Sequence, residues 1–201
     1  MALLQLPDGA WVDHRESFVL DHAALLDALV ATLPLRQEHL RIMGREVLTP
    51  RLTSWHGDPG CFYRYSGRRF EPAPWTPALA ALRQRLVDAQ GVAFNAVLVN
   101  LYRDGGDTMG AHADDEPELG PAPDDVRVAT VSLGARRRFC LVHRRGRERF
   151  EWRLGEGDLL VMGGTTQRRW RHHVPREPAV TRPRLSLTFR VVLPVAPAAV
   201  E

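Results

Sequence analysis

The stretch VRVATVSLGARRRFCLVHRRGRERFEWRLGEGDLLVM, residues 126–162, decides the fold. Within it, residues 126–133, 138–143, 148–154 and 158–162 form short segments rich in β-branched and aromatic residues, separated by glycine and charged residues. Residues 92–102 and 184–193 extend the series on either side. Many short strands in succession are typical of a sandwich or a double-sheet jelly roll, so we expect a mainly β core.

Two helices are predicted upstream of this series. Asp21 is a candidate cap for the first helix, whose apolar face carries leucines at 25, 26, 29 and 33. Thr76 and Pro77 begin the second, which ends before Gly91. Residues 36–75 between them are rich in turn formers and aromatics, which favours hairpins and loops. We therefore predict an α+β fold in which helices support one face of the β core.

The composition is that of one soluble domain: 201 residues, 44% hydrophobic and 25% charged. No apolar run is long enough for a membrane span, no secretion signal is visible, and the two cysteines are expected to be reduced. We expect a cytoplasmic monomer. All 27 basic residues are arginine, and some of them form clusters at 136–138, 144–149 and 168–171. With a net charge of only +3, these clusters fit either a polyanionic partner or a solvated surface.

A candidate metal site begins with a His-x-Asp triplet. His112 and Asp114 face the same way on an extended backbone, so both can reach one ion. A third ligand is available in WRHHV, residues 170–174, where alternation places His172 and His173 on opposite faces without choosing between them. Two histidines and one carboxylate leave coordination positions open, as iron(II) oxygenases require. The alternative is a chance triplet in a non-catalytic jelly-roll module.

A candidate anion site lies in RLSLTFR, residues 184–190. Alternation puts Arg184, Ser186, Thr188 and Arg190 on one face of this strand. The two arginines stand about 20 Å apart, and their long side chains can converge on a short dicarboxylate. Asn100 and Tyr102 add neutral donors. Beside an iron(II) site, such an anion points to 2-oxoglutarate, whereas the alternative is an amphipathic strand with its polar face in water.

Four segments together resemble the AlkB family of Fe(II)/2-oxoglutarate dioxygenases, which reverse alkylation damage on nucleic-acid bases. The resemblance extends from about residue 41 to 193, and it is strongest to the branch that acts on duplex DNA. Its carriers are NLYRDG (100–105), HADDE (112–116), QRRWRHHVP (167–175) and RLSLTFR (184–190).

The resemblance implies roles for individual residues. It implies iron ligation by His112, Asp114 and His172, which decides the choice of histidine. For 2-oxoglutarate, it implies that Arg190 lies near the iron-chelating end, that Arg184 holds the distal carboxylate, and that Asn100 and Tyr102 make neutral contacts. Ser186 replaces an asparagine common in the DNA-repair branch, so we expect weakened or rearranged contacts there.

The resemblance also implies a mode of substrate binding in which a wedge residue enters the base stack and the lesion flips out. Met43 stands at the wedge position, with a core role as its alternative. Tyr65 is expected to stack on the flipped base, Glu116 and Asp115 to attract a cationic lesion, and Arg176 to touch the DNA backbone.

We therefore expect a single dioxygenase domain spanning residues 1–201. Residues 1–90 would hold the N-terminal helices and a nucleotide-recognition lid, and residues 91–194 a catalytic jelly roll, or double-stranded β-helix. The implied function is repair of alkylated DNA: Fe(II), 2-oxoglutarate and O₂ demethylate bases such as 1-methyladenine and 3-methylcytosine, releasing formaldehyde, succinate and CO₂. The substrate is methylated DNA, single- or double-stranded. An RNA demethylase and a protein hydroxylase are the alternatives on this scaffold.

Overall fold

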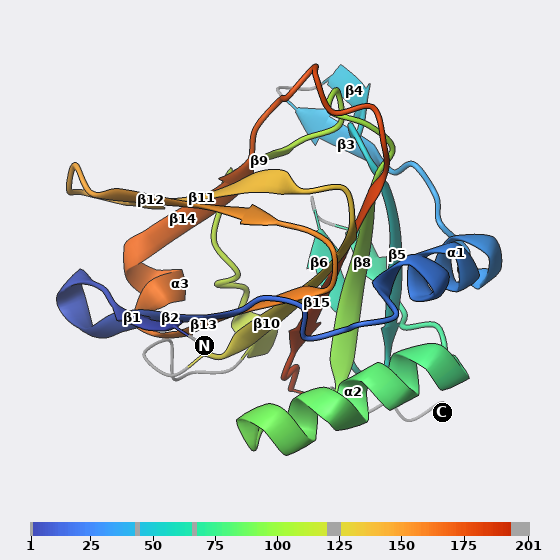
Figure 1. Cartoon of the computed structure of the whole chain (residues 1–201). Coiled ribbons are helices and arrows are strands. Elements are labelled where there is room, and N and C mark those ends of the chain that lie inside the picture. The colour runs from blue at the N-terminus through green and yellow to red at the C-terminus, as the bar shows by residue number, and fades with distance from the viewer. Residues whose placement is uncertain (1, 43–44, 66–67, 120–125, 194–201) are drawn as a thin grey trace, which may run out of the picture.

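The computed structural model describes residues 2–42, 45–65, 68–119 and 126–193, and two antiparallel sheets form its core (Figure 1). The larger sheet has seven strands, in the order β1 (Ala2–Gln5), β2 (Ala10–Arg15), β13 (Asp158–Gly164), β10 (Val128–Gly134), β15 (Arg184–Arg190), β8 (Ala96–Tyr102) and β5 (Leu52–Gly57). The smaller sheet has four strands, in the order β12 (Arg149–Leu154), β11 (Arg137–His143), β14 (Trp170–Val174) and β9 (Met109–His112).

The space between the two sheets is filled mainly by apolar side chains from both of them. Val128, Leu160 and Met162 of the larger sheet meet Leu141 and Trp170 of the smaller one in a single buried cluster. Alternate residues of each strand face this cluster, as a pleated strand requires. The predicted jelly-roll core is therefore confirmed.

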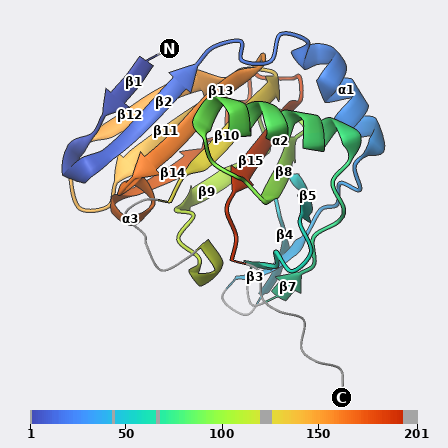
Figure 2. The same cartoon turned by 90° about the horizontal axis from the view of Figure 1, so that it is seen from below.

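The outer face of the larger sheet is covered by helices, as predicted (Figure 2). Both α1 (His22–Thr32) and α2 (Pro77–Gln90) bury leucines against it. The α2 helix begins where Thr76 accepts a hydrogen bond from the Leu79 N–H and ends at Gly91, whose φ of 64° suits glycine. Asp21 also stands at the start of α1, but its side chain makes no capping hydrogen bond. Among the described residues, no helix combines the length and apolar character needed to span a membrane.

Two strand predictions need correction, and two further strands were not predicted. The N-terminal strands β1 and β2, which the sequence did not predict, extend the larger sheet beside β13. The strand predicted over 92–102 begins only at Ala96, and the one predicted over 184–193 ends at Arg190. Both stop there because the Asn95 side chain takes over the pairing: it donates to the Val192 carbonyl and accepts from the Val192 N–H, each at 2.7 Å.

Hairpins do occupy residues 36–75, as the turn-rich composition predicted. They are β3 (His39–Ile42) with β4 (Arg45–Leu48), and β6 (Tyr63–Tyr65) with β7 (Arg68–Phe70), on either side of β5 along the chain. The remaining short helices are η1 (Pro7–Gly9), η2 (Pro117–Leu119) and α3 (Thr166–Arg169). The α3 helix lies directly before β14, the strand that carries His172.

Candidate metal and cosubstrate site

Strand pairing brings His112, Asp114 and His172 together. β14 pairs with β9 so that His172 stands opposite His112, and Asp114 follows two residues after His112. The candidate ligand atoms all lie within 4.8 Å of one another. Asp114 Oδ1 is 3.9 Å from His112 Nε2, and Asp114 Oδ2 is 3.7 Å from His172 Nε2. His173 projects from the other face of β14 and lies outside the cluster.

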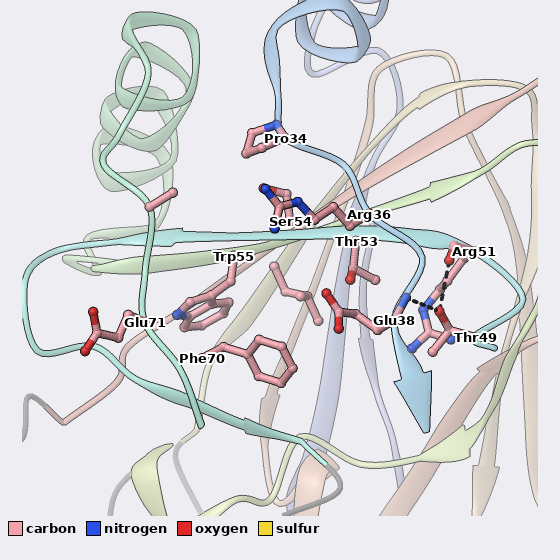
Figure 3. Close-up of a pocket in the computed structure, with 12 residues that line it drawn as sticks. Pro34, Arg36, Glu38, Thr49, Arg51, Thr53, Ser54, Trp55, Phe70 and Glu71 are labelled. Carbon is pink, nitrogen blue, oxygen red and sulfur yellow. Dashed lines mark hydrogen bonds between the residues drawn. The ribbon is translucent and has the colours of Figure 1, made fainter. Parts of the chain in front are cut away.

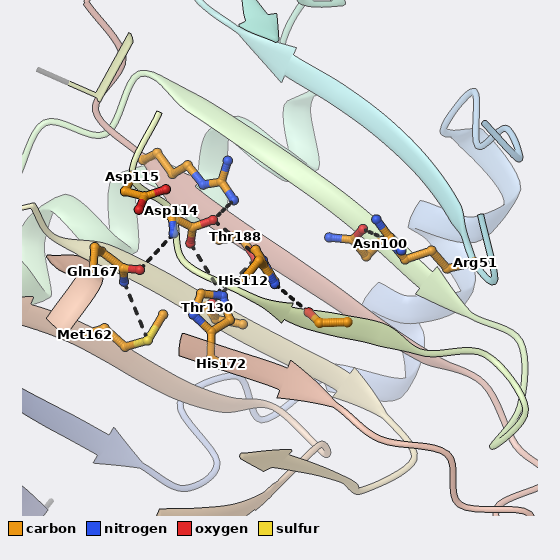
Figure 4. Close-up of polar contacts among 12 residues, drawn as sticks. Arg51, Asn100, His112, Asp114, Asp115, Thr130, Met162, Gln167, His172 and Thr188 are labelled. Atoms are coloured by element: carbon orange, nitrogen blue, oxygen red, sulfur yellow. Dashed lines mark hydrogen bonds and ion pairs between the residues drawn. The ribbon is translucent and has the colours of Figure 1, made fainter. Parts of the chain in front are cut away.

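Both imidazoles are prepared to offer Nε2 as a ligand atom. His112 Nδ1 is 2.9 Å from the Gly110 carbonyl oxygen, which only accepts, so Nδ1 donates this hydrogen bond and Nε2 is the nitrogen that faces the cluster (Figure 4). His172 is buried against the Phe139 ring. Burial, reinforced by the neighbouring His112, lowers the pKa of His172 to about 3, so its ring is neutral.

Asp114 is a fully buried carboxylate held on one side only. Its Oδ1 accepts a hydrogen bond from Arg190 Nη2 at 2.5 Å, whereas its Oδ2 has no hydrogen-bond partner within the part of the chain that the structure describes. Burial opposes ionisation, but the charged Arg190 guanidinium beside it outweighs burial and lowers the pKa of Asp114. An unpartnered buried oxygen beside two imidazole lone pairs is what a bound cation would satisfy.

Arg184 lies on the inner face of β15 and is 1% exposed. Its Nη2 donates to Ser132 Oγ at 2.7 Å, and its guanidinium lies 5.4 Å from the centre of the Tyr102 ring. Among the described residues, Arg184 Nε and Nη1 have no hydrogen-bond partner and no carboxylate lies within 4 Å. Burial lowers the pKa of Arg184 to about 10. A buried guanidinium with two unused donors fits a carboxylate ligand.

The polar face of β15 therefore points inward, not into water. Ser186 stands opposite Asn100 in the β15–β8 register, and Arg184 stands opposite Tyr102. The same inner cavity is lined by the two arginines, these neutral residues and the His112, Asp114 and His172 cluster. All the residues predicted to hold metal or 2-oxoglutarate are thus gathered around one space.

This donor set fits the expected cofactors. Two imidazole nitrogens and a carboxylate suit iron(II) and leave coordination positions open. Arg184 and Arg190 supply cationic donors at the two ends of one polar strand face, which suits a keto-diacid.

The residues predicted to contact the base and the DNA backbone differ in burial, and two of them cannot be described. Met43 and the side chain of Tyr65 lie outside the described residues. Glu116 is partly buried, and burial, together with the nearby Asp114, raises its pKa against the opposing effect of Arg190. Asp115 is half exposed and forms an ion pair with Arg144 at 2.5 Å. Arg176 is exposed in the loop after β14.

A second cavity, of about 200 Å³, adjoins the metal site (Figure 3). It lies between β5 and the segments around the two hairpins, and the Trp55 and Phe70 rings both line it. Leu98 lines this cavity and the metal cavity alike. Arg51 also lines it, while its Nε donates to Asn100 Oδ1 at 2.9 Å. The two cavities are therefore neighbours on the same inner sheet face.

The sequence reasoning missed four residues of this region. Trp55 and Arg51 lie in the segment read only as hairpins and loops, where no periodicity singles them out. Gln167 accepts a hydrogen bond from the Asp114 backbone N–H at 2.9 Å, and Arg144 pairs with Asp115. Both contacts span long sequence separations. No local pattern in the sequence indicates either contact.

The fold and the site together define a two-histidine, one-carboxylate oxygenase. The chain belongs to the 2OG-Fe(II) oxygenase superfamily, whose family model matches residues 19–190. The mouse DNA oxidative demethylase ALKBH2 is 39% identical over 163 residues, covering 77% of this chain and 67% of that protein. The human alpha-ketoglutarate-dependent dioxygenase alkB homolog 3 is 39% identical over 183 residues, covering 85% of this chain and 61% of that protein.

These relatives confirm the expected AlkB family. The human ALKBH2 protein is 37% identical over 162 residues, and the chain spans only 61% of its length. Among solved structures, the one titled "The structure of OsALKBH1" matches with a TM-score of 0.62 at 18% identity, covering 94% of this chain and all of that one. A 2OG-Fe(II) oxygenase from Burkholderia pseudomallei matches with a TM-score of 0.57 at 16% identity. At these identities the two structures support the fold alone.

Proposed function

We propose that this protein demethylates N-alkylated bases in DNA, with Fe(II), 2-oxoglutarate and O₂ as its cofactor and cosubstrates. The observation that carries the proposal is the His112, Asp114 and His172 cluster in the same cavity as the unsatisfied guanidinium of Arg184. The relatives named ALKBH2 support the choice of substrate, because they are DNA oxidative demethylases.

The chain's own residues would bind and orient the reactants. His112, Asp114 and His172 would hold the metal, Arg184 the distal carboxylate of 2-oxoglutarate, and Arg190 the ligating Asp114. Asn100, Tyr102 and Ser186 would supply neutral contacts between the arginines. When bound, iron and 2-oxoglutarate supply the oxidation, in which one oxygen atom enters succinate and the other the methyl carbon. The resulting N-hydroxymethyl group leaves as formaldehyde, and CO₂ is released from the keto acid.

The cavity beside the metal supports a flat, aromatic substrate. Trp55 and Phe70 offer ring faces on which a flipped base can stack, next to Leu98 at the boundary with the metal cavity. Methylation of a ring nitrogen in adenine or cytosine makes the base cationic. Glu116 lies two residues after Asp114, so its carboxylate would attract such a cation close to the metal. Met43 as a wedge and Arg176 as a backbone contact remain parts of the proposal.

The test supplies purified protein with Fe(II), 2-oxoglutarate, O₂ and oligonucleotides that contain 1-methyladenine or 3-methylcytosine. We expect formaldehyde to appear in step with succinate and His112→Ala to abolish both. Succinate without formaldehyde from any methylated oligonucleotide would refute demethylation while leaving the oxygenase assignment intact. Parallel single-stranded DNA, duplex DNA and RNA substrates separate the strand types, and turnover confined to RNA would overturn the DNA substrate.

A further inference from the structure

The short segment that carries Asp114 has little regular structure to hold it. β9 ends at His112, and residues 113–116 belong to no helix or strand before η2 begins at Pro117. The direction of the Asp114 carboxylate therefore depends on contacts that fix this segment from outside. His172 has no such need, because β14 is paired on both sides: with β11 from Trp170 to His173, and with β9 at His172 and Val174.

Gln167 makes one of those contacts from a fully buried position. Its side chain is 1% exposed, and its Oε1 accepts a hydrogen bond from the Asp114 N–H at 2.9 Å (Figure 4). Its Nε2 points the other way and lies 3.6 Å from Met162 Sδ, a weak acceptor. Gln167 belongs to α3, five residues before His172. One side chain thus links the carboxylate ligand to the element that leads into the strand of the second histidine.

Arg144 adds a second link to the next residue. Its Nη2 donates to Asp115 Oδ2 and to the Gln167 backbone carbonyl at 2.5 and 3.1 Å, and its Nε donates to the Trp170 carbonyl at 3.4 Å. The segment after His112 is therefore fastened at two consecutive residues to the same end of the smaller sheet. Neither Gln167 nor Arg144 belongs to the candidate ligand cluster.

We infer that Gln167 is a positioning residue for the metal: it holds the backbone of Asp114 so that the carboxylate meets the ion, and Arg144 supports the same segment through Asp115. The physical reason is preorganisation. A ligand whose backbone is free to move must be ordered when the metal binds, and that cost weakens the affinity. The inference rests on the metal centre of the proposed function and is independent of the nucleic-acid substrate.

The test measures metal affinity in the full-length protein by titration with Co(II), followed by its visible absorption, in the presence of 2-oxoglutarate. Gln167→Met keeps the size of the side chain but removes the acceptor, and we expect about ten-fold weaker Co(II) binding. Met162→Leu is the matched control, because it removes the partner of Nε2 and leaves the bond to Asp114 intact. Its affinity should stay within about two-fold of the wild type.

Arg144→Gln provides a variant at an exposed position that does not threaten folding. We expect about three-fold weaker Co(II) binding, whereas Arg145→Gln, which removes the same charge from the next residue, should bind as the wild type does.

If Gln167 were only part of the core, Gln167→Met would lower the Tm of the metal-free protein without changing the Co(II) affinity. That result, or equal affinity in Arg144→Gln and Arg145→Gln, would overturn the inference. Wild-type protein that binds Co(II) but demethylates nothing would instead refute the proposed DNA substrate alone.

Discussion

Arg184 carries a buried charge that is unfavourable for the ligand-free protein. Its guanidinium is 1% exposed, donates a hydrogen bond to Ser132 and lies against the Tyr102 ring, and burial depresses its pKa. A charge in such surroundings destabilises the fold unless an anion arrives to share it. In the proposed function, the distal carboxylate of 2-oxoglutarate would relieve this unfavourable burial when it binds Arg184.

Replacing Arg184 should separate these two effects. We predict that Arg184→Met raises the KM for 2-oxoglutarate about 10- to 100-fold, since a charge-assisted pair is lost. The same change should stabilise the ligand-free protein by about 1–3 kcal/mol, because a buried, under-paired charge is removed. Steady-state kinetics and urea unfolding measure the two quantities. Arg182→Gln, an exposed neighbour before the strand, is the control, and an unchanged KM in Arg184→Met would contradict the assigned role.

Asp158 is a second single residue, and it predicts how the stability of the fold depends on pH. It is fully buried at the start of β13, where Ser17 and Gly155 N–H groups donate to it and His14 and Arg136 lie nearby. Burial raises its pKa, but the nearby His14 side chain and the hydrogen bonds from the Ser17 and Gly155 N–H groups outweigh burial and lower it. The folded pKa thus lies below the unfolded value of about 4, so the stabilisation is complete above that value and is lost as the pH falls through the folded pKa.

Asp158→Asn should therefore destabilise the protein by about 1–3 kcal/mol at neutral pH, because it removes acceptors from buried donors. The difference from the wild type should stay constant between about pH 7 and pH 5 and shrink below about pH 4. Urea unfolding across this range tests it. A difference that grows on acidification would show that the sign is wrong.

At the scale of elements, helix α2 supports the sheet without reaching the site. Leu86 is completely buried between α2 and the outer face of the larger sheet. We predict that Leu86→Ala lowers the free energy of unfolding by about 2–5 kcal/mol and leaves the KM for 2-oxoglutarate unchanged in the folded protein. Gln84→Ala, on the exposed side of the same helix, should cost less than about 0.5 kcal/mol. A large change in KM for Leu86→Ala would mean that the helix transmits strain to the polar face.

The same elements show what the sequence could predict. Alternation along residues 184–190 correctly assigned Leu187 and Phe189 to one face and Ser186 and Arg190 to the other, because the period of a strand is fixed by its geometry. Capping and spacing predicted α2 for a similar reason. The pairing of β2 with β13 and the link from Gln167 to Asp114 were not predictable, since each depends on contacts between segments about 50 or more residues apart. The choice of His172 over His173 needed the family resemblance.

At the scale of the whole molecule, the exposed arginines are candidates for contacts with the phosphates of a nucleic-acid substrate. Arg145 and Arg147 lie exposed in the turn between β11 and β12. We predict that binding to a methylated oligonucleotide weakens steeply with salt, with log K falling by about 2–5 per tenfold increase in salt concentration. Arg145→Gln combined with Arg147→Gln should reduce that slope by about 1–2. Fluorescence anisotropy measures both, and binding that does not change with salt would refute phosphate contacts.

The central claim is that His112, Asp114 and His172 hold one ferrous ion next to 2-oxoglutarate. The most direct measurement is the visible charge-transfer absorption that Fe(II) and 2-oxoglutarate produce when both bind at one centre, recorded without oxygen. The wild type and His173→Ala should both develop this absorption, and His172→Ala should not, although the two variants differ by one position in β14. Absorption that survives in His172→Ala, or that disappears in His173→Ala instead, would contradict the account.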